Sequence, residues 1–392
     1  MAFATIGTKG IEDAAIATAD IADNAVTSAK TSGIPARPNA QPLVINSDMA
    51  VAQRNSGTVA QSDGSNEGYA TVDRMNLVFG NSAGGVITTS RNTTAPTGFG
   101  QSMKFDVTTA DGSVASNQMV YMKTTLEAQD IRNSGWNYTS SSSYLTLSFW
   151  VRSSKTGIYC AFLETLDASY MRSSEYTISS ADTWEQKVLT FAGKSDLVFN
   201  NDNGAGLNIG FTFVVGTDRD GTNNTWETTN YGTSNQVNFL DSTSNILYLT
   251  GIQLEVGEYT SSTLPPYQHE SYENNLSRCQ RYFNMICDGS QKPIGNGLFW
   301  EAQEVFVTFP INGSTMRTTP SLYTTTGTDY YALYRNGAAD GLTTVTINGS
   351  SSEKTISIYL GSAQGLASDT KNRPCFLRSN DASTKFGLDA EL

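Results

Sequence analysis

Short runs of alternating hydrophobic and polar residues recur between Asn46 and Tyr267. An alternation of two places every second side chain on one face of a strand. In residues 145–151, the hydrophobic set expected to face the core is Leu145, Leu147, Phe149 and Val151. The same alternation occurs in four further runs: Met103, Phe105 and Val107; Met119, Tyr121 and Lys123; Ile158, Cys160 and Phe162; and Leu207, Ile209, Phe211, Phe213 and Val215. Polar turns separate the runs, which indicates an antiparallel jelly-roll sandwich with little helix.

The pattern changes after a last alternating run at residues 246–256. That run places one set of side chains on a common face: Ile246, Tyr248, Thr250, Ile252, Leu254 and Val256. Gly257 ends it, and Pro265-Pro266 prevents a regular ladder in the next stretch. Beyond the prolines, a helical spacing relates Tyr272, Leu276, Cys279 and Phe283. We therefore expect a short linker helix over residues 268–283.

A second, smaller β-domain is expected at residues 284–392. The predicted strands are Gly297–Phe309, Ser321–Thr326, Tyr330–Tyr334, Thr343–Ile347 and Thr355–Leu360. Three dipeptides are of the kind that close hairpins: Asn336-Gly337, Asp340-Gly341 and Asn348-Gly349. So many hairpins in a small sheet would leave strand edges exposed, and neighbouring copies of the chain could cover them.

The first 33 residues contain a five-residue repeat, which comprises Ile6, Ile11, Ile16, Ile21 and Val26. A spacing of five keeps these side chains together neither on a helix nor on a strand. One interpretation is an Ala-rich helix with a weak hydrophobic seam. The other is a segment whose hydrophobic layers are completed by partner chains. Residues 34–45 are rich in proline and are expected to form an extended linker.

Composition excludes several classes of function. The net charge is −12, no basic stripe is present, and nucleic-acid binding is not expected. No apolar run approaches the length of a membrane span, so no membrane insertion is expected. Met1–Gly10 lacks the apolar core of a secretion signal, so synthesis in a cytoplasm is expected. The four cysteines form no CxxC pair, and we expect free buried thiols, although a disulfide stays open.

Candidate catalytic groups are few. His269 is the one histidine in the chain, and its polar neighbours favour an exposed hinge or cap residue over a catalytic base. No phosphate loop is present. A glycosidase needs two carboxylates across a cleft, and no ordered pair stands out among the acidic residues. We expect no cofactor, apart from a structural calcium ion that carboxylates near Asp63 or Glu67 could hold.

Aromatic residues in two long polar loops are the candidate carbohydrate-binding residues. They are Trp136 and Tyr138 in the first loop and Trp226 and Tyr231 in the second. Neither loop is expected in the core, and aromatic rings beside amides and hydroxyls are typical of sugar sites. The alternative is that these rings hold the loops in place or contact a neighbouring subunit. If so, Tyr330, Tyr331 and Tyr334 of the C-terminal domain become the next candidates.

Several segments resemble tail-fibre proteins of tailed bacteriophages. In the sandwich these are LTLSFWVRSSKTG, SADTWEQKVLTF and GIQLEVG, and at the junction NNLSRCQRYF. VTFPINGSTMRTTPSL and the closing GLDAEL are similar to C-terminal fibre domains. IEDAAIATADIADNAVTSAK resembles the short N-terminal repeats of the same proteins. The landmarks follow the order of the family along the whole chain.

This resemblance implies a virion protein assembled in the host cytoplasm as a homotrimer. It implies attachment to a tail or baseplate protein through residues 1–33, a carbohydrate-binding-like jelly roll at 46–267 and a distal C-terminal sandwich. Recognition of a host surface polysaccharide is the expected function. Two alternatives stay open: a polysaccharide depolymerase on a fibre scaffold, and a head or neck decoration protein without a receptor. No enzymatic activity is expected, although jelly rolls occur both in enzymes and in binding modules.

Overall fold

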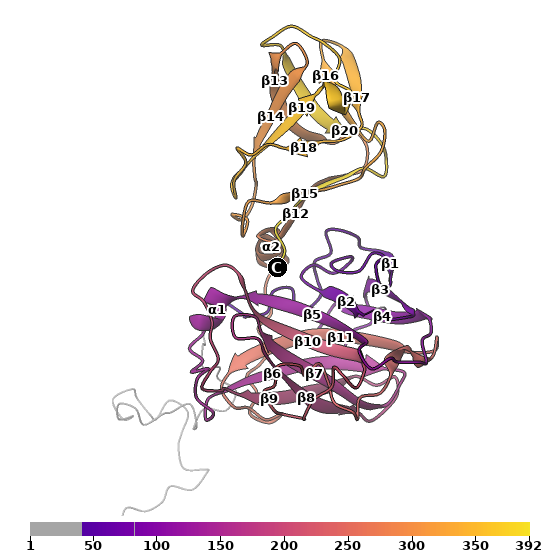
Figure 1. Cartoon of the computed structure of the whole chain (residues 1–392), viewed down its shortest axis with the longest axis vertical. Coiled ribbons are helices and arrows are strands. Elements are labelled where there is room, and N and C mark those ends of the chain that lie inside the picture. Colours follow the sequence, from indigo (N-terminus) through magenta and orange to yellow (C-terminus); the bar gives the residue numbers. More distant parts are fainter. Residues whose placement is uncertain (1–40, 82) are drawn as a thin grey trace, which may run out of the picture.

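The computed structural model describes residues 41–81 and 83–392 of the chain, and they form two all-β domains joined by a short helix (Figure 1). The all-β, jelly-roll-like architecture predicted from the alternation is therefore confirmed. The expected attachment residues Ile6, Ile11, Ile16, Ile21 and Val26 lie outside the described residues.

The larger domain is a sandwich of two antiparallel sheets. In spatial order, the six-stranded sheet contains β1 (Thr58–Gln61), β3 (Val86–Asn92), β4 (Ser102–Thr109), β11 (Ile246–Val256), β6 (Tyr144–Ser153) and β9 (Glu185–Ala192). The five-stranded sheet contains β2 (Asn76–Gly80), β5 (Met119–Glu127), β10 (Ala205–Val215), β7 (Gly157–Thr165) and β8 (Tyr170–Ile178). A short helix, α1 (Ala128–Arg132), follows β5, and a 3₁₀ turn, η3 (Phe239–Asp241), precedes β11.

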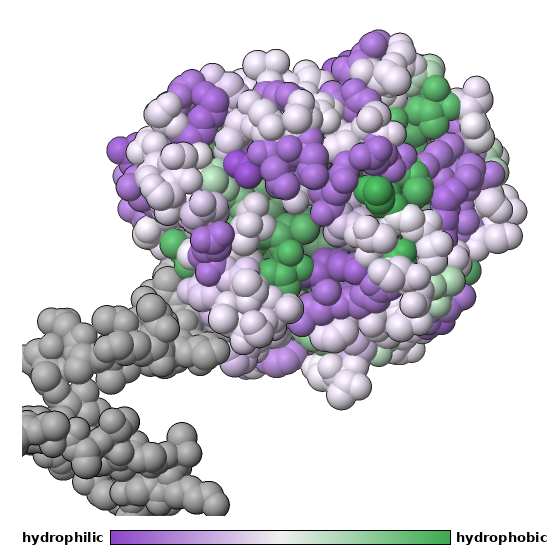
Figure 2. All heavy atoms as spheres, turned by 90° about the horizontal axis from the view of Figure 1, so that it is seen from below, coloured by the Kyte–Doolittle hydropathy of each residue, from purple (hydrophilic) through white to green (hydrophobic). Residues whose placement is uncertain are grey.

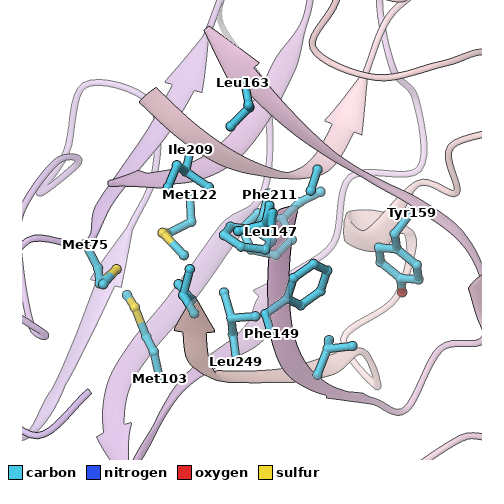
Figure 3. Close-up of a cluster of buried hydrophobic side chains, with 14 of the residues drawn as sticks. Met75, Met103, Met122, Leu147, Phe149, Tyr159, Leu163, Ile209, Phe211 and Leu249 are labelled. Carbon is cyan, nitrogen blue, oxygen red and sulfur yellow. The ribbon is translucent and has the colours of Figure 1, made fainter. Parts of the chain in front are cut away.

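The core lies between these two sheets and is built from the alternating residues. Phe149 of β6, Phe211 of β10 and Leu249 of β11 meet in its centre (Figure 3). Phe149 and Phe211 pack edge to face with ring centroids 4.8 Å apart. Leu43 and Val44 are also buried in this core. The extended linker expected over residues 34–45 therefore does not include Leu43 and Val44, which belong to the folded domain.

The face assignments predicted for β5 and β7 are wrong. In β5, Val120 and Met122 face the core, whereas Tyr121 lies on the outer face of the sheet. Tyr159, Ala161 and Leu163 face the sandwich core, whereas Phe162 packs with Tyr121 on the outer face of the five-stranded sheet. The loop between β10 and η3 covers part of that outer face, so both faces of β7 are apolar. A strand that is buried on both faces gives no alternation from which its inner face can be recognised.

Strand β11 also departs from the prediction, because it changes face half-way. Leu247 and Leu249 face the core before a β-bulge, and Ile252 and Leu254 face it afterwards. The bulge lies between Thr250 and Gln253, and Gly251 in its centre has φ +63°. An inserted residue reverses the alternation, so the predicted set is correct only in its second half.

The linker helix is α2 (Tyr272–Gln280), and its N-cap residue Ser271 accepts a hydrogen bond from the backbone N–H of Asn274. Asn275 and Cys279 are buried on it, whereas Tyr272 is 58% exposed. The predicted stripe therefore fails at Tyr272. It also fails at Phe283, which already belongs to strand β12. Among the described residues, no helix is long and apolar enough to cross a membrane.

The C-terminal domain packs a three-stranded sheet and a seven-stranded sheet around a second core. In spatial order, the smaller sheet contains β12 (Phe283–Asp288), β21 (Lys385–Asp389) and β15 (Ser321–Thr324). The larger contains β17 (Ala338–Leu342), β16 (Tyr331–Arg335), β20 (Pro374–Ser379), β13 (Pro293–Glu301), β14 (Glu304–Pro310), β19 (Thr355–Gly361) and β18 (Thr346–Ile347). The 3₁₀ turn η4 (Ser362–Gln364) follows β19.

The hairpin signals in this domain were partly correct. Asn336-Gly337 turns β16 into β17, and both residues have positive φ. Asp340-Gly341 instead lies inside β17, and the single strand predicted over 297–309 is the hairpin of β13 and β14. Strands β12, β17, β20 and β21 were not predicted. The four cysteines are free and buried, as expected, and burial raises the pKa of Cys160, Cys287 and Cys375 to about 11 each.

Ion pairs, hydrogen bonds and a cation–ring contact join the two domains. Glu391, near the C-terminus, forms ion pairs with Arg54 and Arg74 of the large domain. Glu127, at the end of β5, accepts hydrogen bonds from Arg281 at 2.7 Å and from the Tyr282 hydroxyl at 2.7 Å. The Arg74 guanidinium also lies 3.5 Å from the centroid of the Tyr282 ring. These contacts are called the interdomain seam below. They join Arg54, Arg74 and Glu127 of the large domain to Arg281, Tyr282 and Glu391.

Candidate functional site

Trp136 is a core residue, contrary to the expectation from its polar loop. Its side chain is 3% exposed, packs against Tyr138 and Phe199, and donates a hydrogen bond from Nε1 to the Ser143 carbonyl at 3.3 Å. The loop can bury this ring because its backbone is paired elsewhere: the Lys194 N–H bonds to the Tyr138 carbonyl at 2.9 Å. A ring enclosed in this way offers no face to a sugar.

Trp226 is half-buried and closes an open side of the sandwich. Its ring packs against the core, and its Nε1 donates to the carbonyl of Ala192, the last residue of β9, at 2.8 Å. The neighbouring Glu227 pairs through its backbone with Met171 of β8. Since β8 and β9 are edge strands of the two sheets, Trp226 lies where the edges of the two sheets meet.

Tyr231 lies apart from the other three aromatic residues. It stacks on Tyr121 with ring centroids 5.2 Å apart and meets the edge of Phe162 at 5.4 Å, on the outer face of the five-stranded sheet. Its role in this arrangement is to hold the loop between β10 and η3 against the sheet. The structure therefore brings the loop of Trp136 and Tyr138 close to Trp226, but not to Tyr231.

A pocket of about 420 Å³ opens where these two loops meet. Three segments of chain line it, and the lining residues are Thr139, Ser141, Gly193, Lys194, Ser195, Asn224, Thr225 and Trp226. Trp226 is the aromatic residue of this set, and the others supply hydroxyl, amide and ammonium groups. In the view from below, the surface is largely polar, and its hydrophobic areas are small and separated (Figure 2).

The charged groups at this pocket are held in a defined arrangement. The Lys194 ammonium lies 4.3 Å from the centroid of the Tyr170 ring and forms an ion pair with Asp196. Asp196 also accepts hydrogen bonds from the Tyr170 hydroxyl at 3.1 Å and from the Ser195 hydroxyl at 2.6 Å. The hydrogen bond from Lys194 is the main cause that lowers the pKa of Asp196 to about 2. Asp196 is therefore a fixed acceptor at neutral pH and not a proton donor.

Lys194, Asp196 and Tyr170 are site residues that the sequence does not predict. Lys194-Ser195-Asp196 is a charged turn directly after a strand, and in that respect it resembles many other turns of this chain. Its partner Tyr170 lies 24 residues earlier, at the start of β8. Only the pairing of the strands brings the three side chains together, so no local signal could have identified them.

The other candidate groups named from the sequence are His269, expected to be an exposed hinge or cap residue, and the carboxylates Asp63 and Glu67. His269 is exposed, and its ring lies 4.7 Å from that of Tyr267 and 5.3 Å from that of Phe99. It precedes the N-cap of α2, and its ring contacts are aromatic. Asp63 and Glu67 are exposed in the turn after β1. Within residues 41–81 and 83–392, no group of three or more His, Cys, Asp or Glu side chains could hold a metal ion.

A larger pocket, of about 660 Å³, lies at the interdomain seam. Its charged side chains are already engaged with each other or with neighbours: Arg281 with Glu127, and Arg278 with Glu270 at 2.5 Å. One of its lining residues is Gln41, the first residue that the structure describes. We therefore regard this space as part of the domain contact and the Trp226 pocket as the candidate site.

Comparisons with known proteins identify similar folds but no family. Neither known protein families nor curated proteins match the sequence. Among solved structures, the chain is similar to the enzymatically active domain of tailspike protein 4 of bacteriophage CBA120, with 13% identity and a TM-score of 0.25 over 52% of this chain and 21% of that one. It is also similar to the family 11 carbohydrate-binding module of a Clostridium thermocellum cellulase, with 12% identity and a TM-score of 0.27 over 49% of this chain and 92% of that one. A third similar structure is the module TmCBM61 in complex with β-1,4-galactotriose, with 10% identity and a TM-score of 0.25 over 55% of this chain and 99% of that one. Because these TM-scores are low, no activity of these proteins is transferred to this chain.

Proposed function

We propose that this chain is a virion tail-fibre protein whose large sandwich binds a host-surface glycan in the Trp226 pocket. The observation that carries the binding proposal is the combination of one partly accessible tryptophan with hydroxyl, amide and charged groups from three loops. Sugar sites combine an apolar ring with a few polar groups in this way. The volume of about 420 Å³ lies within the range of small-ligand pockets, at its lower end.

In this proposal Trp226 packs against the apolar face of one sugar ring. Thr139, Ser141 and Asn224 bond to its hydroxyl groups. The fixed pair of Lys194 and Asp196 supplies one donor and one acceptor at the rim, and it also accommodates an acidic sugar through Lys194. Specificity would then come from the rim, because the tryptophan accepts many sugars with an apolar face.

The virion assignment rests on the ordered fibre-like segments of the sequence. In this assignment, residues 1–33 attach the protein to a tail or baseplate protein, and the chain assembles as a homotrimer. Three weak pockets on one rigid particle gain avidity without new contacts, so a single shallow site suffices for adsorption.

Binding of the full-length chain to immobilised bacterial lipopolysaccharides and capsular polysaccharides tests the glycan proposal. Lys194→Ala should weaken binding to the preferred glycan by about tenfold to a hundredfold, in keeping with the loss of one hydrogen bond to a charged group. Lys155→Ala is the matched control, because Lys155 forms a similar surface ion pair with Asp241 elsewhere on the sandwich. Equal binding by both variants would remove the pocket from consideration.

The two alternatives give different results in related assays. A depolymerase would release reducing ends from the polysaccharide it binds, whereas a binding protein would not. A head or neck decoration protein would label the capsid or neck of intact particles instead of the tail. Labelled antibody on purified particles, observed by electron microscopy, distinguishes these positions.

A further inference from the structure

Arg172 of β8 lies beside the Trp226 pocket. The loop of Trp226 pairs with β8 through Glu227 and Met171, and this antiparallel pairing places Trp226 opposite Arg172. Opposite residues of an antiparallel pair project to the same face. Both side chains reach one acceptor, because the Ala192 carbonyl accepts hydrogen bonds from Trp226 Nε1 at 2.8 Å and from Arg172 Nη1 at 3.4 Å. The guanidinium therefore lies close to the indole nitrogen of the candidate platform.

The positive charge of Arg172 is not neutralised by the protein. In the part of the chain that the structure describes, this half-buried side chain forms no ion pair, and its long bond to the Ala192 carbonyl is its one hydrogen bond. Its Nε is buried and has no hydrogen-bond partner. Burial lowers the pKa of the guanidinium; Tyr144 acts in the opposite direction, and no carboxylate contributes. A guanidinium carries five N–H donors, so its terminal nitrogens keep donors for a ligand.

The neighbouring charges leave Arg172 as the uncompensated one. Lys194 is also positively charged, but its ion pair with Asp196 neutralises it. The Glu227 carboxylate accepts a hydrogen bond from the backbone N–H of Thr222 at 3.1 Å, within its own loop. The chain as a whole has a net charge of −12. The protein therefore does not attract an anionic polymer through its overall charge, and a local cationic group has to favour one.

We propose that the Trp226 pocket selects acidic glycans and that Arg172 binds the carboxylate of a uronic acid or another carboxylate-bearing sugar. The inference rests on the proposed glycan binding and names the class of glycan. Trp226 packs against the sugar ring, and the terminal N–H groups of Arg172 meet the carboxylate, a pairing that suits the planar guanidinium. Burial of an unpaired charge costs free energy, and a bound carboxylate recovers part of that cost. Arg172, and not the neutralised Lys194, is then the main partner of the acidic group.

Chemical reduction of the carboxyl groups provides the test, because it turns each carboxylate into a neutral alcohol and leaves the polysaccharide backbone unchanged. The affinity of the full-length protein is measured for uronic-acid-containing capsular polysaccharides and for their carboxyl-reduced forms. The wild type should bind the acidic form about tenfold to a hundredfold more tightly, the range for one hydrogen bond to a charged group. Arg172→Gln should bring the ratio of the two affinities close to one and leave the affinity for the reduced form unchanged. A purely structural role of Arg172 would instead change both affinities alike.

Arg219→Gln is the matched control and should keep the wild-type ratio. Arg219 is also half-buried and donates from Nε to a backbone carbonyl, that of Asn117, at 3.2 Å. Its own carbonyl accepts from the N–H of Tyr231, which lies apart from the pocket. Arg172→Lys keeps the charge but not the planar fork, so its ratio should fall between those of the wild type and Arg172→Gln. This second variant also serves if Arg172→Gln fails to fold.

The outcomes separate this inference from the proposed function. Equal wild-type affinity for the acidic and reduced forms, or binding of neutral polysaccharides alone, would overturn the selectivity and leave glycan binding in place. A ratio that survives Arg172→Gln would place the carboxylate at Lys194 and would also overturn the inference. Absence of binding to every polysaccharide would overturn the proposed function, and this inference with it.

Discussion

Single residues in this protein show how poorly a polar sequence context predicts exposure. Trp136 and Trp226 occur in loops of similar composition, yet the first is enclosed and the second is half-buried beside a pocket. The difference comes from their partners: Phe199 and Tyr138 enclose Trp136, whereas Trp226 lies at the free edges of two sheets. Tyr138 is close to Trp136 in the sequence, but the contacts of Trp136 with Phe199 and of Trp226 with the sheet edges depend on strand order and cannot be identified from a single sequence.

Replacement of Trp136 should therefore reduce stability. Trp136→Ala removes a large buried ring and should lower the free energy of unfolding by about 3–5 kcal/mol, the range for large aromatic residues in cores. Urea denaturation of the full-length protein measures the change. Tyr272→Ala serves as the comparison and should change the free energy of unfolding by less than about 0.5 kcal/mol, because its side chain is 58% exposed on α2.

At the scale of elements, strand positions were easier to predict than the faces of the strands. The alternation correctly located β4, β6 and β10 and their core residues. It failed at β5 and β7, which carry apolar residues on both faces, and at β11, where a bulge reverses the alternation. Bulges and strand partners are properties of pairs of strands, so a single strand's sequence contains only indirect signs of them. For β11 that sign was Gly251, in the middle of an otherwise β-branched and aliphatic run.

Gly251 is the one glycine of β11 and should not tolerate a larger side chain. A Cβ atom at this position would lie 2.7 Å from the Phe99 ring, and φ +63° is unfavourable for alanine. Gly251→Ala should destabilise the protein by about 1–3 kcal/mol through both effects. Gly100→Ala provides the control in the same urea titration, because no atom lies within 4 Å of its added Cβ. Equal urea concentrations at the unfolding midpoint for the two variants would show that the bulge tolerates a side chain.

At the scale of the whole molecule, the seam joins segments far apart in the sequence. Arg54 and Arg74 from the start of the large domain meet Glu391 near the end of the chain. The order of the domains was foreseeable from the sequence, because the spacing changes at Gly257 and again at Phe283. Their contact was not foreseeable, because isolated arginines and glutamates occur throughout the chain and gave no sign of their pairing.

Removal of Met1–Gly33 tests whether this segment attaches the protein to the virion without contributing to the stability of the fold. The described fold begins its core at Leu43, so the deletion leaves every described contact intact. The melting temperature of the remainder should change by less than about 2 °C, which corresponds to about 1–2 kcal/mol for a chain of this size. Incorporation into virus particles, followed by immunoblotting of purified virions, should be lost. Normal incorporation of the shortened chain would exclude the attachment role of this segment.

Gln53 and Asp73 make the stability of the protein at the domain contact depend on pH. Gln53 donates from Nε2 to Asp73 at 2.6 Å and to the Phe283 carbonyl of the C-terminal domain at 2.7 Å. Burial raises the pKa of Asp73 to about 6, although the hydrogen bonds from Gln53 act in the opposite direction. Since the carboxyl titrates near pH 4 in an unfolded chain, the native state binds the extra proton between about pH 4 and pH 6. The contribution of Asp73 to stability is therefore greatest below about pH 4 and is lost as the pH rises through 6.

Asp73→Asn should remove this pH dependence. In urea titrations from pH 4 to pH 7, the wild type should lose about 1–3 kcal/mol of unfolding free energy relative to the variant as the pH rises, because each unit of pKa shift corresponds to about 1.4 kcal/mol. The change in slope is the readout, since the variant can also alter stability uniformly through its hydrogen bonds to Gln53. Asp196→Asn is the control: the pKa of Asp196 is lowered to about 2, so its titration contributes below pH 4 and leaves the slope above it unchanged. Parallel pH profiles for wild type and Asp73→Asn would mean that the Asp73 carboxyl does not hold its proton at the seam and that water reaches it there.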